Sequence, residues 1–239
     1  MQVTTKAIVF SALKYGDTSL VVKAFTATHG VMSYLLQGVL TAKKGKVKPA
    51  YFQPLAQLEL VANHRNNANL QRIREARVHY HYQTLHTDMA KNALTLFLAE
   101  MLRNSIHEEE ANPALFQYLE TALQWFDGES KTANFHIAFL LTLTKYLGFY
   151  PDAKNREWAY FDLLEGGFVA SPTLNPLLQG QVLQHFKRFL GTPFEALDSI
   201  KMNRTERQEL LLQMINYFEL HLQGFKKPRS LGVLHDVFH

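Results

Sequence analysis

The chain has 239 residues, of which 47% are apolar and 19% are charged, and its formal net charge is +4. This apolar content is enough to bury a hydrophobic core, which excludes global disorder. The lack of cysteine excludes a disulfide scaffold, a thiolate nucleophile and every zinc site that requires a thiolate. Because no stretch of 18 apolar residues and no signal-peptide core is present, we expect a soluble, cytoplasmic protein of one or two domains that has no membrane partner.

The charge is unevenly distributed along the chain. Residues 1–82 carry eleven basic and three acidic side chains, a net charge of +8, whereas residues 83–239 have a net charge of −4. A basic domain joined to a mildly acidic one indicates that the basic domain binds a polyanion. Charge alone leaves open the alternative of a solvated basic surface without a ligand.

The first 82 residues have the pattern of a small β-domain, because β-branched and aromatic residues recur in short segments separated by turn sequences. The five predicted strands are residues 6–13, 19–28, 31–39, 52–61 and 70–80. Five short strands joined mostly by tight turns favour a closed barrel of the oligonucleotide-binding (OB) type. Side-chain alternation in 70–80 is imperfect, so the sequence does not separate the inner from the outer face of that strand.

After Thr84 the apolar period becomes that of helices. Two of the predicted helices are recognised by an apolar stripe, within residues 94–101 and within residues 182–190. Three others have start and end signals: from Asn112-Pro113 to Gly128, from an Asn134 cap to Leu147, and from an Asn203–Glu206 capping box to Gly224. The expected fold class is α+β. A five-stranded OB-fold domain of residues 1–82 precedes an all-α helical domain of residues 83–239, which has an irregular, cysteine-free insert at about residues 149–175.

Motifs for catalysis are absent: the sequence has no phosphate loop, no GxGxxG, no GxSxG and no HExxH. His79 and His81 have strand spacing that would place them on one side, but the sequence offers no third metal ligand. The run Glu108-Glu109-Glu110 is typical of a solvated helix end, since successive helix side chains do not converge. We therefore expect a protein that is not an enzyme and that has no cofactor and no metal.

Basic residues of the β-domain are the candidates for nucleic-acid binding. Four lysines between positions 43 and 48 lie in a connection beside Gly45, where flexible ammonium groups can follow a phosphate backbone. Tyr34, Tyr51 and Phe52 could stack on bases where exposed, although core packing is favoured for Phe52. Not all of the candidate cations can face one groove, because strand neighbours point in opposite directions. The predicted DNA contacts are Lys14, Lys23, Lys43, Lys44, Lys46, Lys48, Arg65, Arg72, Arg74 and Arg77.

Several segments carry a resemblance to a known family when they are taken in order. They are Thr5-Lys-Ala-Ile-Val-Phe, Tyr15-Gly16-Asp17, residues 20–26, Gly30, Gly38, Phe52-Gln-Pro-Leu55, residues 70–75, and Gly224-Phe-Lys-Lys-Pro-Arg-Ser230-Leu near the C-terminus. In this order and over nearly the whole chain, they resemble the RecO family of bacterial recombination mediators.

The resemblance implies binding of single- and double-stranded DNA, annealing of complementary strands, and help in loading the RecA recombinase onto DNA coated by single-strand binding protein (SSB). The implied partners are RecR and the acidic C-terminal tail of SSB. Such a tail needs a basic rim around an apolar pocket. Candidates in the helical domain are Lys187, Arg188, Lys201, Arg204 and Arg207. The competing hypothesis is a non-enzymatic interaction scaffold without a direct role on DNA.

The insert departs from the family pattern. Many RecO-like chains carry a four-cysteine zinc module in the helical part, whereas residues 150–168 keep the proline and the Gly-Gly pair but have no cysteine. We therefore predict no zinc here. Packing of Trp158, Tyr160, Phe161 and Phe168 is expected to hold the insert instead.

Overall fold

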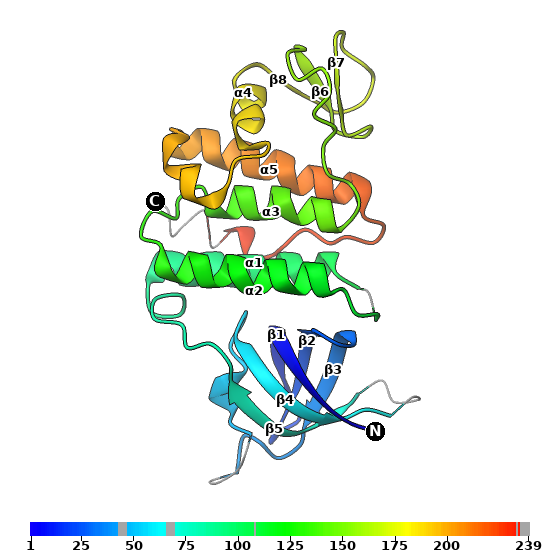
Figure 1. Ribbon diagram of the computed structural model, residues 1–239, viewed down its shortest axis with the longest axis vertical. Helices are drawn as coiled ribbons and strands as arrows, with labels where there is room; N and C mark the ends of the chain where they lie inside the picture. The colour runs from blue at the N-terminus through cyan, green and yellow to red at the C-terminus, as the bar shows by residue number, and fades with distance from the viewer. Residues whose placement is uncertain (43–46, 66–69, 108, 233, 235–239) are drawn as a thin grey trace. The chain divides into compact units, whose positions relative to one another are not determined.

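The computed structural model describes residues 1–42, 47–65, 70–107, 109–232 and 234 (Figure 1). The chain divides into two compact units. The first unit contains residues 1–128 and the described residues from 228 onward, and the second contains residues 129–227. The first two helices thus share a unit with the N-terminal sheet. The boundary between residues 82 and 83 follows the change in secondary structure and stays a prediction.

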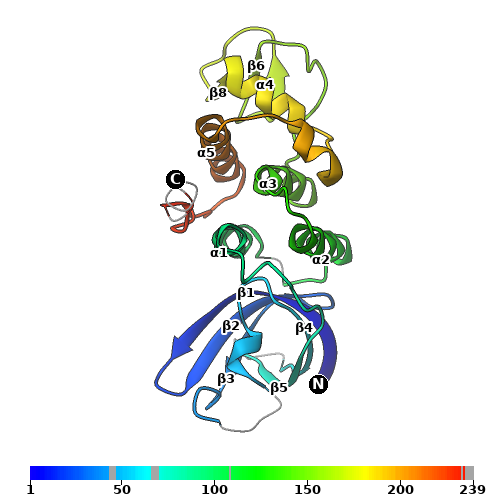
Figure 2. The same ribbon diagram turned by 90° about the vertical axis from the view of Figure 1, so that its left-hand side faces the viewer.

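Five antiparallel strands form the N-terminal sheet, in the order β3-β2-β1-β4-β5. Their bounds are β1 (Gln2–Tyr15), β2 (Ser19–Thr26), β3 (Gly30–Leu36), β4 (Gln57–Asn63) and β5 (Arg72–Val78). A parallel bridge between Tyr34 and Gln71 joins β3 to the start of β5 and closes the sheet into a barrel (Figure 2). A short 3-10 helix, η1 (Pro49–Tyr51), lies in the connection between β3 and β4. The predicted five-stranded barrel is confirmed.

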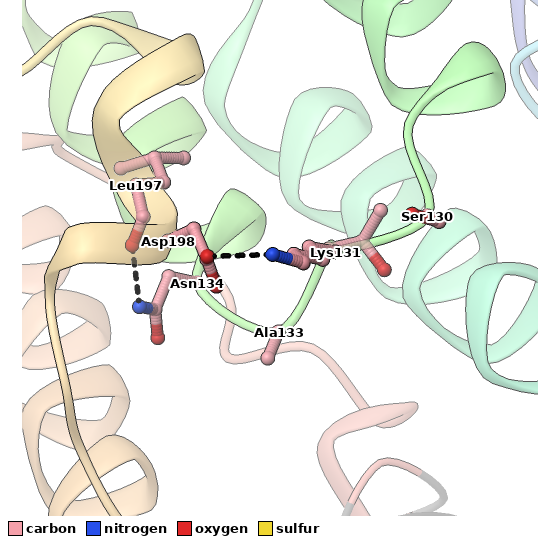
Figure 3. Close-up of a pocket in the computed structure, with 7 residues that line it drawn as sticks. Ser130, Lys131, Ala133, Asn134, Leu197 and Asp198 are labelled. Carbon is pink, nitrogen blue, oxygen red and sulfur yellow. Dashed lines mark hydrogen bonds and ion pairs between the residues drawn. The ribbon is translucent and has the colours of Figure 1, made fainter.

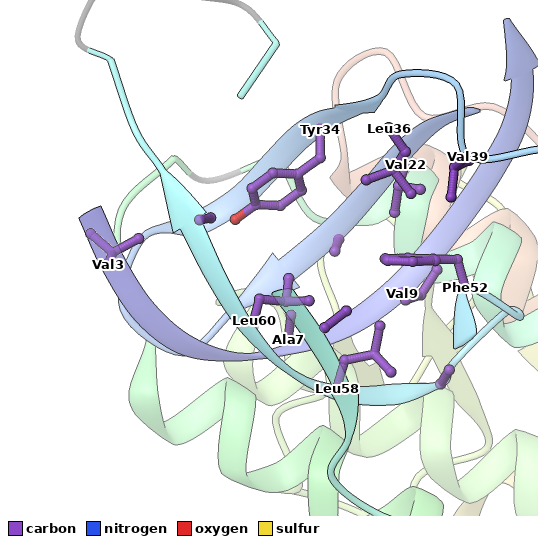
Figure 4. Close-up of a cluster of buried hydrophobic side chains, with 14 residues drawn as sticks. Val3, Ala7, Val9, Val22, Tyr34, Leu36, Val39, Phe52, Leu58 and Leu60 are labelled. Carbon is purple, nitrogen blue, oxygen red and sulfur yellow. The ribbon is translucent and has the colours of Figure 1, made fainter. Parts of the chain in front are cut away.

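Alternate residues of the strands fill the barrel interior, as Figure 4 shows. Tyr34, Val22 and Leu58 are completely removed from solvent, and Phe52 closes the interior from the connection that precedes β4. Burial of each large apolar side chain contributes about 1.5–3 kcal/mol. Burial of these alternating apolar side chains is therefore the main contribution to the stability of the barrel.

Two irregularities in strand register explain why the alternation is incomplete. The pairing of β1 with β2 shifts at Phe10, and the pairing of β4 with β5 shifts at Arg74. An extra residue in one strand reverses the side to which the following side chains point. Ile73 and Ala76 therefore both face the core although they are three positions apart. This bulge is the cause of the mixed pattern in the last strand.

Helices α1 (Met89–Ser105) and α2 (Pro113–Gly128) lie side by side over the outer side of β1 (Figures 1 and 2). Asn112 caps α2 as predicted, because its side chain accepts a hydrogen bond from Leu115 N at 3.0 Å. The Phe25 ring of β2 lies 5.9 Å from the Phe116 ring of α2, measured between centroids. On the same side Lys6 Nζ is 2.9 Å from Glu120 Oε1. One outer surface of the barrel is thus covered, and Lys6 on that surface is paired.

A buried carboxylate fixes the segment between barrel and helices. Asp127, which is 2% exposed, accepts hydrogen bonds from the backbone N–H groups of Gln83, Thr84 and Leu85 at 2.8–3.1 Å. Desolvation alone would raise its pKa, but these donors outweigh it and hold the pKa below the ordinary aspartate value. Lys91 Nζ donates to the Asp127 carbonyl oxygen at 2.7 Å. The connection is therefore a rigid part of the first unit.

The described residues after Pro228 pack on α1. Glu100 Oε2 accepts hydrogen bonds from Ser230 N at 2.9 Å and from Ser230 Oγ at 2.7 Å. Leu234 is buried in the same region. This contact brings the basic and serine-containing end of the sequence into the first unit.

The second unit combines helices with a small sheet. Its helices are α3 (Phe135–Tyr146), α4 (Gly180–Phe189) and α5 (Arg204–His221), with the 3-10 helix η2 (Phe194–Ser199). The predicted capping box is present, since Asn203 Oδ1 accepts from Glu206 N at 3.0 Å and Asn203 N donates to Glu206 Oε2 at 2.7 Å. Asn134 occupies the predicted N-cap position of α3, but its side chain makes no capping hydrogen bond. Its side-chain amide donates to Leu197 O and Ile200 O instead, because this asparagine is buried against η2.

The insert is more ordered than its sequence suggests. Strands β6 (Tyr160–Asp162), β7 (Gly167–Val169) and β8 (Leu177–Gln179) form a sheet in the order β7-β6-β8. The Phe161 ring contacts the rings of Phe168 and Phe186 at centroid distances of 5.1 and 4.8 Å, so the predicted packing of Phe161 and Phe168 is confirmed. Trp158 and Tyr160, the other two predicted residues, are half-buried.

A buried carboxylate that the sequence analysis did not single out holds the turns of this sheet. Asp162 is 1% exposed and accepts hydrogen bonds from Leu164 N, Glu165 N, Thr173 Oγ1 and Asn175 Nδ2 at 2.8–3.2 Å. These donors outweigh desolvation and lower the pKa of the carboxyl. Gly166 must be glycine, since its φ is +69° and an added Cβ would lie 2.8 Å from the Tyr217 hydroxyl oxygen.

Candidate nucleic-acid interface

A groove of about 280 Å³ opens on the barrel between the end of β3 and the start of β5. Apolar side chains make most of its lining, and Arg72 contributes the cation. Lys43, Lys44 and Lys46 lie outside the described residues, but Ala42 and Val47 on either side of that stretch both line the groove. The remaining lining residues are Leu35, Leu36, Gln37, Val39 and Ile73. An apolar lining next to cations suits a nucleotide, which offers a base and a phosphate.

Lys48 extends this basic region toward η1. It is exposed, and its ammonium nitrogen lies 5.7 Å from the centre of the Tyr51 ring. The hypothesis that Tyr34 stacks on bases is wrong, because its ring is fully buried in the barrel. Core packing of Phe52 is confirmed. Tyr51 is half-buried against the same core.

The predicted arginines lie on or near β5, and all of them are exposed. Arg72 borders the groove, Arg74 donates to Gln2 Oε1 at 3.0 Å, and Arg77 lies 4.0 Å from Glu75. Arg65 sits in the β4–β5 connection, whose base is closed by hydrogen bonds between the Gln71 amide and the Arg65 backbone. These arginines therefore line one side of the barrel but differ in their neighbours.

The two remaining predicted contacts lie elsewhere on the barrel. Lys14 is exposed at the end of β1, beside the turn to β2. Lys23 is half-buried on the outer face of β2, and its pKa is lowered by desolvation and then by the nearby charge of Arg103. The cations thus fall into separate groups rather than into one groove.

The basic candidates of the second unit are also divided. Lys201 and Arg207 line a hollow of about 500 Å³, together with Ile200, Met202 and Glu206. An adjoining hollow of about 350 Å³ is shown in Figure 3, where Lys131 Nζ lies 2.8 Å from Asp198 Oδ2. Lys187, Arg188 and Arg204 line neither of these hollows.

Arg207 is held firmly in this region. Its Nε donates to Asn134 Oδ1 at 3.0 Å and its Nη2 donates to Met202 O at 3.1 Å. His136, on α3, is buried with its Nδ1 unpartnered among the described residues, and desolvation followed by the charge of Arg207 lowers its pKa to about 3. A neutral histidine therefore lies beside this guanidinium at physiological pH.

Candidate metal ligands do not converge in the part of the chain that the structure describes. His79 Nε2 lies 3.4 Å from Glu120 Oε1, and no group of three histidine, aspartate or glutamate side chains in that part is placed to hold a metal ion. Across the same residues, every helix is too short or too polar to cross a membrane.

The order of the strands, the closing bridge from β3 to β5 and the exposed cations around the groove define the class of protein: an α+β protein whose first domain is an OB-fold. Residues 1–82 match the family model "Recombination protein O N terminal", and residues 86–231 match "Recombination protein O C terminal". The chain belongs to the RecO family, so the resemblance seen in the sequence is confirmed.

Full-length relatives support the same assignment. The DNA repair protein RecO of Christiangramia forsetii is 49% identical over 238 residues, which cover 100% of both chains. The proteins of the same name from Flavobacterium psychrophilum and Bacteroides fragilis are 44% and 38% identical, over 100% and 98% of both chains.

Proposed function

We propose that this protein is a non-enzymatic mediator of DNA repair and recombination. It binds single- and double-stranded DNA, anneals complementary strands and, with RecR, helps to load RecA onto DNA coated by SSB. A protein that acts on bacterial chromosomal DNA in this way works in the cytoplasm. The observation that carries the proposal is the apolar groove edged by Arg72, whose lining includes Ala42 and Val47. Its relatives' shared name, DNA repair protein RecO, supports it.

The groove suggests how annealing would proceed. Phosphates bind the exposed ammonium and guanidinium groups, while bases lie against the apolar lining. Neutralising the phosphates of two strands lowers their mutual repulsion, and holding them close raises their effective concentration. No bond of the DNA is broken in this scheme, so no catalytic group is required.

The decisive experiment measures pairing of complementary oligonucleotides that are covered by SSB. We expect the protein to accelerate pairing in a salt-sensitive manner. Naked oligonucleotides serve as the control for annealing without SSB. A pairing rate that the protein leaves unchanged in both arms overturns the proposal.

The lysine stretch is tested by a salt titration of single-stranded DNA binding. Each phosphate contact that is removed lowers the slope of log affinity against log salt by about 0.7. The quadruple variant Lys43/Lys44/Lys46/Lys48→Ala should therefore have a distinctly smaller slope than the wild type. Lys145→Ala, an exposed lysine of α3, is the matched control. An unchanged slope in the quadruple variant shows that this stretch does not contact DNA.

We also propose that the acidic tail of SSB binds the second unit at the hollow lined by Lys201 and Arg207. Ile200 and Met202 supply an apolar lining, and the two cations can bind carboxylates. Lys187, Arg188 and Arg204 are proposed as outlying contacts for the remaining acidic residues of the tail. Chemical-shift mapping with a tail peptide tests this placement. Shifts that are confined to barrel residues contradict it.

Two competing functions have direct tests. A scaffold without a role on DNA would show no salt-dependent retention by immobilised single-stranded DNA. An enzyme acting on nucleic acid would degrade labelled DNA when divalent metal ions are added. We expect salt-dependent retention and intact DNA.

A further inference from the structure

Three polar side chains form one row across the outer face of β1, β2 and β3. In the strand register Lys23 of β2 is paired with Ser11 of β1 on one side and with Ser33 of β3 on the other. Residues paired across antiparallel strands point to the same side, with Cβ atoms about 5 Å apart. The neighbouring pair Ala12–Val22 faces the core, so this row faces outward. Two hydroxyl groups therefore flank one ammonium group.

The row contains donors whose hydrogen-bonding capacity is unused. Within the described part of the chain, the side chains of Ser11, Lys23 and Ser33 have no hydrogen-bond partner, and Lys23 has no carboxylate at ion-pair distance. All three residues are half-buried, so they are only partly hydrated. Leaving an ammonium group partly desolvated and unpaired is costly, which makes this position receptive to an anion.

Arg103 lies near the end of α1, the helix that packs against β1, and its charge acts on Lys23 of the row. Its charge contributes to the lowered pKa of Lys23, after the larger effect of desolvation. The only carboxylate paired with Arg103 in the described residues is Glu100, whose Oε1 lies 3.6 Å from Arg103 Nη2, too far for a hydrogen bond. The other oxygen of Glu100 is occupied by Ser230. The guanidinium therefore retains donors for a further acceptor.

The next outward row along the same strands is apolar. Leu13, Val21 and Leu35 lie two residues from the polar row, which is about 7 Å along the strands. Leu13 is 58% exposed, and Leu35 also lines the groove beside Arg72. The outer face of the barrel thus passes from hydroxyl and cationic donors to an apolar row and then to the groove.

We propose that Ser11, Lys23, Ser33 and Arg103 form the binding site for one phosphate group. The site offers hydrogen-bond donors and positive charge, which match the oxygens of a phosphodiester or of a free phosphate anion. In the DNA complex it would bind the backbone where the strand leaves the groove, with a base over Leu13 and Val21. This inference rests on the proposed function and adds Arg103 of α1 to the DNA-binding surface.

The test is a salt titration of binding to a fluorescent oligothymidine by the full chain. Lys23→Ala and Arg103→Ala should each lower the salt slope by about 0.7, since each disrupts binding of one phosphate. Because both cations hold the same phosphate, the double variant should lose no more slope than either single variant. Arg103→Lys should recover part of the slope, and Lys145→Ala should have none of these effects. Unchanged slopes in both single variants, or additive losses in the double variant, overturn the proposal.

A second measurement separates the sources of the phosphate group and does not depend on affinity. Side-chain nitrogen spectra of Lys23 and Arg103 are recorded during titration with inorganic phosphate and, separately, with the oligonucleotide. Shifts with both probes indicate a general phosphate site, and shifts with the oligonucleotide alone indicate a phosphodiester site. No shift with either probe overturns the proposal. Thermal unfolding of each variant identifies any that are misfolded, and Ser11→Ala and Ser33→Ala give a milder second pair of variants.

The outcomes also distinguish this inference from the proposed function. If the variants at Lys23 and Arg103 change the salt slope but Arg72→Ala does not, the phosphate site stands and the groove assignment fails. If inorganic phosphate shifts the Lys23 signal but the protein does not bind DNA, the site stands and the DNA function fails.

Discussion

The two units differ in whether their lysines and arginines are paired with acceptors within the chain. On the barrel, Lys14, Lys48 and Arg72 have no carboxylate within 4.0 Å among the described residues. In the second unit, Lys131 and Lys201 lie 2.8 and 3.6 Å from Asp198. Lys187 Nζ donates to Trp158 O at 2.7 Å, and Lys227 lies 2.9 Å from Glu219. These four lysines of the second unit are therefore bound within the chain, whereas Lys14, Lys48 and Arg72 on the barrel are available to an external anion.

The same contrast exists within the barrel. On the side covered by α1 and α2, Lys6 is paired with Glu120, and farther along β5 Arg77 has Glu75 as a neighbour. Around the groove and on the outer face of β2, the cations lack such partners in the described chain. The net charge of a segment therefore overstates the number of its cations that can bind DNA. A cation that is already paired with a carboxylate is less available to bind a phosphate and release a counterion from DNA.

The largest expected effect is a loss of stability when the buried carboxylate of the second unit is removed. Asp162→Ala leaves several buried donors without an acceptor and should lower the free energy of unfolding by about 3 kcal/mol or more. Urea unfolding measures this loss. Asp152→Ala, an exposed aspartate of the same insert, is the control and should leave the urea midpoint unchanged. If both variants are equally stable, the role assigned to Asp162 in holding the insert is wrong.

A smaller loss is expected at the carboxylate that joins the barrel to its helices. Asp127→Asn should lower the free energy of unfolding at pH 7 by about 2 kcal/mol, because the amide cannot accept all of the backbone donors. The pKa of Asp127 is lower in the folded state, so its contribution is present above the unfolded value of about 3.9 and is lost as the pH falls through the folded value. The difference between wild type and variant should therefore shrink below about pH 4. A difference that grows on acidification contradicts this account.

The groove cations should affect DNA binding without affecting stability. Lys48→Ala combined with Arg72→Ala should lower the salt slope for single-stranded DNA by about 1.4, twice the value for one phosphate contact. The urea midpoint should stay unchanged, since both side chains are exposed. A normal slope in this folded double variant would remove the groove from the binding surface.

The smallest effect is expected from a paired cation of the second unit. Lys131→Ala should leave the salt slope of DNA binding at the wild-type value, because the ammonium is already bound to Asp198. A reduced slope would show that paired cations of this unit also contact DNA, which would break the comparison.

Local signals in the sequence were sufficient for several elements. The alternation of apolar residues predicted five strands, and the Asn112 and Asn203 caps marked the starts of α2 and α5. The helix predicted from Asn134 to Leu147 is present as α3. These signals act within a few residues, through side-chain periodicity and caps, so one sequence is enough to detect them.

Other features depended on residues far apart in the chain. Asn134 is a residue type that commonly caps helices, but its side chain is bound to η2 instead. Asp127 and Asp162 acquire their roles from hydrogen-bond donors that folding brings to them. The bulges at Phe10 and Arg74 are set by pairing with neighbouring strands. None of these partners can be identified from local periodicity.

By itself the sequence determined the order of the barrel strands and of helices α1 to α5, the lack of cysteine, the excess of positive charge in the first 82 residues and the membership of the RecO family. Tertiary structure decided which cations are paired within the chain and which three strands place Ser11, Lys23 and Ser33 in one row. The physical reason is that composition and periodicity are local, whereas charge pairing and strand register are fixed only when distant segments come into contact.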